Sequence, residues 1–94
     1  MTFEHKLYDS LNSRQRRELK EQYVEWQDGI CTFCRESLKS PAPSRVTDNK
    51  IEWRAFPPGF LNNPVHLQHD HETGMTEGAV HAYCNAVLWQ YYGK

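Results

Sequence analysis

Four residues of the sequence have the types and the spacing of ligands for a metal ion. Cys31 and Cys34 form a CxxC pair, and His81 and Cys84 repeat the same spacing near the end of the chain. Two such pairs can close one tetrahedral Zn²⁺ site from three thiolates and one imidazole. The chain has three cysteines, which cannot all pair in internal disulfides. A reduced metal-binding group is therefore favoured over a disulfide framework.

A second group of polar residues lies between these pairs and directly after them. The run from His66 to His71 contains three histidines, and Asn85 follows the last cysteine. A zinc site would hold this run close to Asn85. An imidazole with a pKa of about 6.5 can act as a general base, and an amide carbonyl can bind a hard cation such as Mg²⁺. Such a grouping is able to hydrolyse a phosphodiester bond.

The elements that position these residues can be predicted from apolar spacing and turn residues. A helix is expected over residues 12–28, because Asn12 and Gln15 fit a capping box and Gly29 provides a left-handed stop. The CxxC pair then lies in a tight turn of the zinc-knuckle type. Residues 40–64, rich in proline, are expected to form an insert loop with a short strand over residues 51–56.

Residues 65–92 are expected to form a ββα unit. Strands over residues 65–70 and 78–81 would pair as a hairpin with Gly74 in its turn, and a helix would start at Asn85. The predicted fold class is a small α+β zinc-stabilised domain, with an N-terminal helix, a zinc knuckle, a β-hairpin and a C-terminal helix. Residues 1–94 are expected to make a single domain.

Composition limits the classes of function. With 94 residues and 38% hydrophobic residues, the core is modest, and a structural metal would supplement it. The net charge of −1 argues against nonspecific DNA binding by the whole surface. Acids interleave with the basic residues of the first helix, which favours an ordinary solvated surface over a DNA-contacting one. No apolar run reaches the roughly 18 residues of a membrane span, and the N-terminus lacks a signal-peptide core, so a cytoplasmic protein without a membrane partner is expected.

The order of these motifs resembles the phage recombination endonuclease VII group of the HNH, or ββα-metal, nucleases. The similar segments are Lys6 to Tyr8, Asp28 to Glu36, His66 to His71, Thr73 with Gly74, Gly78, and Cys84 with Asn85. The resemblance covers residues 6–88, with the insert unmatched. It implies a phage-encoded endonuclease that nicks or cleaves DNA with Mg²⁺ or Mn²⁺. It also implies structural Zn²⁺ on Cys31, Cys34, His81 and Cys84, although the family normally has cysteine in place of His81.

The resemblance also implies roles for the polar residues. The general base falls on His69, an auxiliary phosphate-contacting histidine on His71, and a ligand of the divalent cation on Asn85. The family's metal-binding aspartate is replaced by Gln68, whose neutral carbonyl is a weaker ligand for a cation. Where the family usually has a basic residue before the glycine of the second strand, this chain has Glu77, which would repel phosphate.

A second function is left open by these two departures. A catalytically weakened ββα zinc domain could act as a modulator that binds a host or phage protein, or a nucleic acid. The insert carries Trp53, Phe56 and Phe60, and aromatic side chains are frequent anchors of protein interfaces. The same side chains could instead cover a small core.

Overall fold

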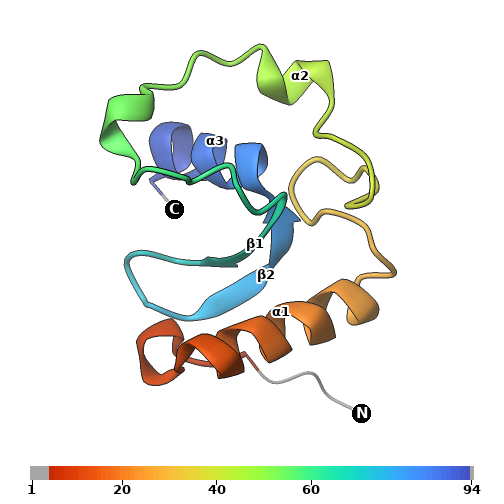
Figure 1. Ribbon diagram of the computed structural model, residues 1–94, viewed down its shortest axis with the longest axis vertical. Helices are drawn as coiled ribbons and strands as arrows, with labels where there is room; N and C mark the ends of the chain where they lie inside the picture. The colour runs from red at the N-terminus through yellow and green to blue at the C-terminus, as the bar shows by residue number, and fades with distance from the viewer. Residues whose placement is uncertain (1–4, 94) are drawn as a thin grey trace.

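The structure, a computed structural model, describes residues 5–93 and contains the predicted helix, cysteine turn, β-hairpin and second helix in that order. It is a small α+β fold with one two-stranded antiparallel sheet. Figure 1 shows the hairpin between α1 on one side and α3 on the other. The elements are α1 (Ser13–Trp26), α2 (Ser44–Thr47), β1 (Val65–His69), β2 (Thr76–His81), α3 (Ala82–Tyr92) and two 3₁₀ turns, Tyr8–Ser10 and Trp53–Ala55.

Helix α1 begins as the sequence predicts. The Asn12 side chain accepts a hydrogen bond from the Gln15 amide at 2.8 Å, and the Gln15 side chain accepts one from the Asn12 amide at 2.9 Å. This reciprocal capping box satisfies two backbone donors that the helix leaves unpaired. The helix ends at Trp26, before Asp28 and Gly29 adopt positive φ angles of 55° and 71° and turn the chain into the cysteine turn.

The hairpin contains an irregularity beside His69. Gln68 lies opposite Gly78, but His69 lies opposite Thr76, so Glu77 is an extra residue on β2. Such a bulge bends the strand and changes the direction of the neighbouring side chains. The end of β1 that carries His69 is therefore locally distinct from the regular pairing that precedes it.

The segment before α1 forms backbone hydrogen bonds with the turn end of the hairpin. The Thr76 amide donates to the Lys6 carbonyl oxygen at 2.7 Å, and the Tyr8 amide donates to the Gly74 carbonyl oxygen at 2.8 Å. These backbone bonds fix Tyr8 beside the end of β1, although the two segments are far apart in the sequence. A tyrosine near the N-terminus is thereby brought next to His69.

Helix α1 is attached to β2 by side chains as well as by its apolar stripe. Tyr23 is fully buried, and the Gln27 side chain both donates to the Ala79 carbonyl oxygen (2.9 Å) and accepts from the Ala79 amide (2.8 Å). A Cβ at position 78 would lie 2.9 Å from Gln27 Oε1, which explains why residue 78 is a glycine.

Within residues 5–93, none of the helices has the length and apolarity required to cross a membrane.

Three local predictions were wrong. The insert is not loop alone, because Ser44–Thr47 forms α2 and buries Val46 in the core. Residues 51–56 contain a 3₁₀ turn at Trp53–Ala55 rather than a strand, and Trp53 packs edge-on against Tyr83 of α3 (5.2 Å between ring centroids). Helix α3 starts at Ala82, one turn earlier than expected, so Asn85 lies inside the helix.

Candidate functional site

The four predicted metal ligands lie together in the interior. Their ligand atoms are all within 4.8 Å of one another, and all four side chains are buried. Cys31 and Cys34 come from the turn after α1, His81 ends β2, and Cys84 lies in the first turn of α3. The group therefore joins the cysteine turn, the end of β2 and the start of α3.

Distances within this group fit a tetrahedral metal ion. His81 Nδ1 lies 3.4 Å from Cys34 Sγ and 3.7 Å from Cys84 Sγ. Metal–ligand bonds of roughly 2.3 Å to sulfur and 2.0–2.1 Å to nitrogen imply an S···N edge of about 3.6 Å in a tetrahedron. Three thiolates and an imidazole are ligands that such an ion accepts, so Cys31, Cys34, His81 and Cys84 could hold a metal.

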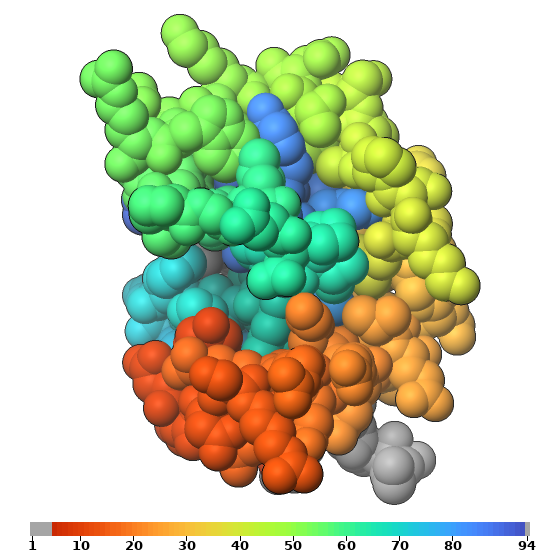
Figure 2. Space-filling model, in the orientation of Figure 1, coloured from red at the N-terminus to blue at the C-terminus, as the bar shows by residue number. Residues whose placement is uncertain are grey.

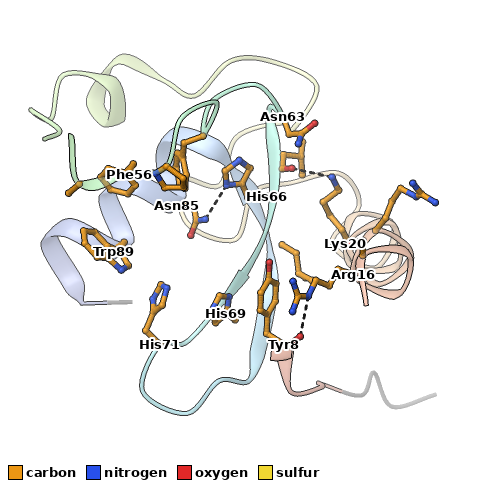
Figure 3. Close-up of a pocket in the computed structure, with 17 residues that line it drawn as sticks. Tyr8, Arg16, Lys20, Phe56, Asn63, His66, His69, His71, Asn85 and Trp89 are labelled. Atoms are coloured by element: carbon orange, nitrogen blue, oxygen red, sulfur yellow. Dashed lines mark hydrogen bonds between the residues drawn. The ribbon is translucent and has the colours of Figure 1, made fainter. Parts of the chain in front are cut away.

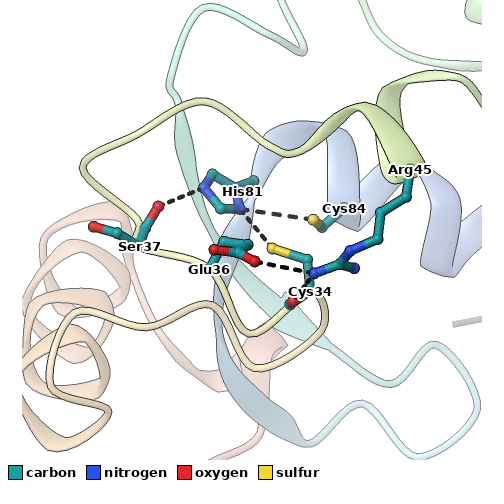
Figure 4. A network of polar contacts seen from close by, with 6 residues as sticks. All are labelled: Cys34, Glu36, Ser37, Arg45, His81 and Cys84. Atoms are coloured by element: carbon teal, nitrogen blue, oxygen red, sulfur yellow. Dashed lines mark hydrogen bonds and ion pairs between the residues drawn. The ribbon is translucent and has the colours of Figure 1, made fainter.

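The orientation of His81 supports the same conclusion. Its Nε2 lies 2.9 Å from the Ser37 carbonyl oxygen and 2.8 Å from the Ser40 carbonyl oxygen, as Figure 4 shows for Ser37. Two acceptors require that Nε2 carries the proton, which leaves the lone pair of Nδ1 directed toward the thiols. Arg45 closes the same turn by donating to the Cys34 carbonyl oxygen and to the Glu36 carboxylate.

The three thiols of this group change one another's pKa values. Hydrogen bonding from Cys84 and from the backbone amides of Cys34, His81 and Phe33 lowers the pKa of the Cys31 thiol to about 4, against the effect of burial. The hydrogen bond to Cys31 and burial raise the pKa of Cys84, and burial raises that of Cys34. A bound cation would take the place of the shared protons.

A cleft of about 800 Å³ contains the predicted catalytic histidines. We call its side formed by α1 the basic wall, which consists of Arg16, Arg17 and Lys20. The opposite side, the aromatic wall, consists of Phe56, Phe60 and Trp89. In Figure 2 the surfaces of α1 (orange) and of the insert (green) face each other across this region. The polar residues between the walls are His66, His69, His71 and Asn85.

His69 is held in the cleft by ring stacking. Its ring lies parallel to that of Tyr8, with 4.0 Å between centroids and 11° between planes, and the Arg16 guanidinium lies 3.9 Å from the Tyr8 centroid. Figure 3 shows Tyr8 between His69 and Arg16. Burial lowers the pKa of His69, and the nearby charges of His71 and Arg16 lower it further. The imidazole is therefore neutral at neutral pH, the state that a general base requires.

The other two histidines contact different partners. His71 lies in the turn after β1, with 4.6 Å between its ring centroid and that of His69. His66 Nδ1 accepts a hydrogen bond from Asn85 Nδ2 at 3.1 Å, and burial lowers the pKa of His66 (Figure 3). Within residues 5–93, Asn85 Oδ1 has no protein partner, so this carbonyl oxygen can accept a ligand.

Gln68 is placed apart from the other predicted site residues. Its side chain is 4% exposed and donates to the Glu77 carboxylate at 2.7 Å. Neither residue lines the cleft. The structure therefore brings His69, His71 and Asn85 together but does not add Gln68 to them. The negative charge of Glu77 lies outside the cleft as well, where it does not face a bound phosphate.

Sequence reasoning missed the basic wall of the cleft and the Trp89 part of its aromatic wall, although it had singled out Phe56 and Phe60. Interleaved acids made α1 look like an ordinary solvated helix, but Ser13, Arg16, Arg17 and Lys20 follow the spacing i, i+3, i+4, i+7 and therefore share one face. This spacing was a signal that could have identified the basic wall. Tyr8 and Trp89 had no comparable signal, because their positions depend on contacts between distant segments.

The chain was compared with protein-family models, curated proteins and solved structures, and no match was found in any of the three. The resemblance to the HNH nucleases consequently stays a prediction that rests on the quoted residues.

Proposed function

We propose that this protein is an HNH-type DNA endonuclease in which His69 is the general base. The observation that carries this proposal is the neutral imidazole of His69, stacked on Tyr8 in a cleft whose basic wall can bind phosphate. A hydrogen bond donated to His69 by a described residue would occupy its basic nitrogen, but none is present among residues 5–93. The ring can therefore accept a proton from a water molecule.

In the proposed reaction, the basic wall holds the phosphodiester and His69 deprotonates the attacking water. The resulting hydroxide attacks phosphorus, the bond between phosphorus and the leaving oxygen breaks, and that oxygen takes a proton from solvent water. A divalent cation, Mg²⁺ or Mn²⁺, would neutralise charge on the phosphate. The residues present fit such an ion only in part, because Asn85 Oδ1 lines the cleft while the amide of Gln68 is bonded to Glu77.

We further propose that the ion held by the four buried ligands is Zn²⁺ and that its role is structural. Four protein ligands leave no open coordination position for a substrate or a water. Three free, buried cysteines also suit a reducing compartment such as the cytoplasm of a host cell.

Plasmid nicking tests the endonuclease proposal. Supercoiled DNA is incubated with Mg²⁺ or Mn²⁺ and with wild type, His69→Ala or Arg14→Ala, all purified identically. Loss of a general base is expected to lower the nicking rate by about 10²–10⁴-fold. Arg14 lies outside the cleft and pairs with Glu18, so Arg14→Ala should retain the wild-type rate. Absence of metal-dependent nicking by folded wild type would refute the proposal.

One observation favours the second candidate function, a binding module without catalysis. No carboxylate is found among the described residues that line the cleft, so a hard cation there would lack its preferred charged ligand. The same plasmid assay separates the candidates. A binding module leaves the plasmid supercoiled at every concentration of divalent cation, whereas an endonuclease converts it to the open-circular form. A protein partner held by Trp53, Phe56 and Phe60 is less supported, since Phe56 and Phe60 pack against the core.

A further inference from the structure

The aromatic wall presents a continuous surface of rings toward the predicted catalytic residues. The centroid of Phe56 lies 4.8 Å from that of Phe60 and 5.1 Å from that of Trp89. Trp89 in turn lies 6.4 Å from His71, while Phe60 lies 4.6 Å from His66. Trp89 is 40% exposed, although it borders the cleft and belongs to a cluster of rings. Trp89 therefore offers exposed ring surface to a ligand in the cleft, beside His71.

The basic wall offers the complementary chemistry. It carries three cations, and no carboxylate is present among the described lining residues, although the whole chain has a net charge of −1. The glutamates of α1 thus lie on its other faces. Because Arg16 and Lys20 are one helical turn apart, the wall presents its charges as a row. A row of cations opposite exposed rings is the arrangement by which proteins bind unpaired nucleic acid strands.

We propose that the cleft binds an unpaired stretch of a DNA strand, with its phosphates on the basic wall and a base stacked on Trp89. This inference rests on the proposed function for the identity of the ligand and specifies the form of DNA that enters the site. In a double helix the bases stack on one another, so Trp89 cannot reach a base face. The cleft volume of about 800 Å³ also lies in the roughly 300–1,000 Å³ range of sites for small ligands. A single strand can enter such a space.

Fluorescence anisotropy tests this inference without any cleavage. A dye-labelled single-stranded oligonucleotide is titrated with the full chain, with no added divalent cation. The competitors are the same strand annealed to its complement, and the same strand with abasic sites in its middle. We expect the intact single strand to bind at least about tenfold more tightly than either form, because each stacked base contributes substantially to affinity. Equal or tighter binding of the duplex or of the abasic strand would overturn the inference.

Variants of two tryptophans locate the stacking contact. Trp89→Ala should weaken binding of the intact strand by about tenfold and leave the abasic strand unaffected, since only the stacking surface is lost. Trp89→Phe keeps a ring and should retain most of the affinity. Weak binding by Trp89→Ala together with near-normal binding by Trp89→Phe therefore reports the loss of the ring rather than misfolding. Trp26 is 59% exposed and does not line the cleft, so Trp26→Ala is the matched control. An unchanged affinity of folded Trp89→Ala would contradict the proposed contact.

The two proposals fail in different experiments. If the single strand binds as described but plasmid DNA is never nicked, the endonuclease proposal is refuted and the unpaired-strand inference stands. If plasmid DNA is nicked in a His69-dependent manner but duplex and single strand bind equally, the inference is refuted and the endonuclease proposal stands.

Discussion

Gln68 and Glu77 are two of the residues at which this sequence departs from the nuclease family that it resembles, and they contact each other. The Gln68 amide donates to the Glu77 carboxylate across the hairpin at 2.7 Å, beside the bulge that precedes His69. The two departures are therefore coupled: an amide at one position satisfies a carboxylate at the other. Their shared role is to hold the end of the hairpin, next to the cleft but outside it.

A charge-swap series tests this coupling. Gln68→Glu would place two carboxylates at hydrogen-bond distance and should lower the free energy of unfolding by about 1–3 kcal/mol at neutral pH. Adding Glu77→Gln restores one amide and one carboxylate and should recover most of that loss. Urea denaturation of wild type, both single variants and the double variant measures the interaction energy. Additive effects of the two changes would contradict the coupling.

The same series has a predictable pH dependence. Repulsion raises the pKa of the carboxylate pair in folded Gln68→Glu above the unfolded value of about 4.3. The stability deficit should therefore be absent below about pH 4 and grow as pH rises through the raised pKa. A deficit that does not change between acidic and neutral pH would show that packing, rather than charge, causes it.

His69 supports a second prediction at the residue scale. Burial lowers its pKa, so the imidazole should be mainly neutral at pH 6.5 and become half-protonated only at lower pH. NMR titration of the imidazole C–H signals measures this value directly. Tyr8→Ala removes the stacked ring, exposes His69 to water and should move its pKa upward, toward 6.5. The acidic limb of any nicking activity should move in the same direction.

A change in the pKa of His69 can be distinguished from a general effect of Tyr8→Ala on the protein. His66 accepts a hydrogen bond from Asn85 and packs edge-on against Phe60 rather than against Tyr8, so its titration in the same spectra is the internal control. A pKa of His69 at or above 6.5 in wild type, or no response to Tyr8→Ala, would contradict the assigned role of Tyr8.

At the scale of elements, α1 has two charged faces that the sequence alone did not separate. One face carries Arg14 paired with Glu18 at 3.0 Å, and both side chains are exposed. The other face forms the basic wall of the cleft. Helical periodicity places the two sets on different sides, even though acids and bases alternate along the chain.

Salt dependence distinguishes these faces. Each phosphate contact contributes about 0.7 to the slope of log affinity against log salt for a single strand. Arg17→Ala should reduce the magnitude of that slope by about this amount and weaken binding at low salt. Arg14→Ala removes the same charge from outside the cleft and should leave the slope unchanged. Equal effects of the two variants would place the strand elsewhere on the molecule.

Elements with local signals were predictable, and those formed by distant contacts were not. Asn12 and Gln15 determine the start of α1 through their own side chains, and Gly74 marks the hairpin turn with its φ of 78°. The 3₁₀ turn at Trp53 was mistaken for a strand, because alternating residues predict a strand only where a partner strand exists. Trp53 instead packs on α3. Likewise, the stacking of Tyr8 on His69 depends on backbone pairing with Gly74 that no local pattern reveals.

At the scale of the whole molecule, the buried group of three cysteines and His81 joins the cysteine turn, β2 and α3. The sheet has only two strands, and such a hairpin is marginal without further support. Metal binding contributes about 10–16 kcal/mol in zinc-finger peptides, which is comparable to the total stability of a small domain. The fold around the cleft is therefore expected to depend on this ion.

Chelation tests that dependence. One Zn²⁺ per chain is expected by elemental mass spectrometry of protein purified without chelator. Addition of EDTA should unfold the protein cooperatively, and added Zn²⁺ should restore the circular dichroism spectrum. Acid should have the same effect as EDTA, because protons compete with the ion for thiolates and imidazole. Zinc-free protein that retains its fold would refute a structural role.

Substitution of His81 separates two of its contributions, metal ligation and the Nε2 hydrogen bonds to Ser37 and Ser40. His81→Cys keeps four ligands but gives up the Nε2 bonds to Ser37 and Ser40. Zinc should remain bound with an affinity lower by about 10–100-fold, the usual effect of losing such supporting bonds. His81→Ala leaves three ligands and should lose both zinc and the cooperative unfolding transition. His71→Ala removes a histidine from the cleft instead and should keep its zinc, because the metal group and the cleft use separate residues. Loss of zinc in His71→Ala would show that the two sites are not independent.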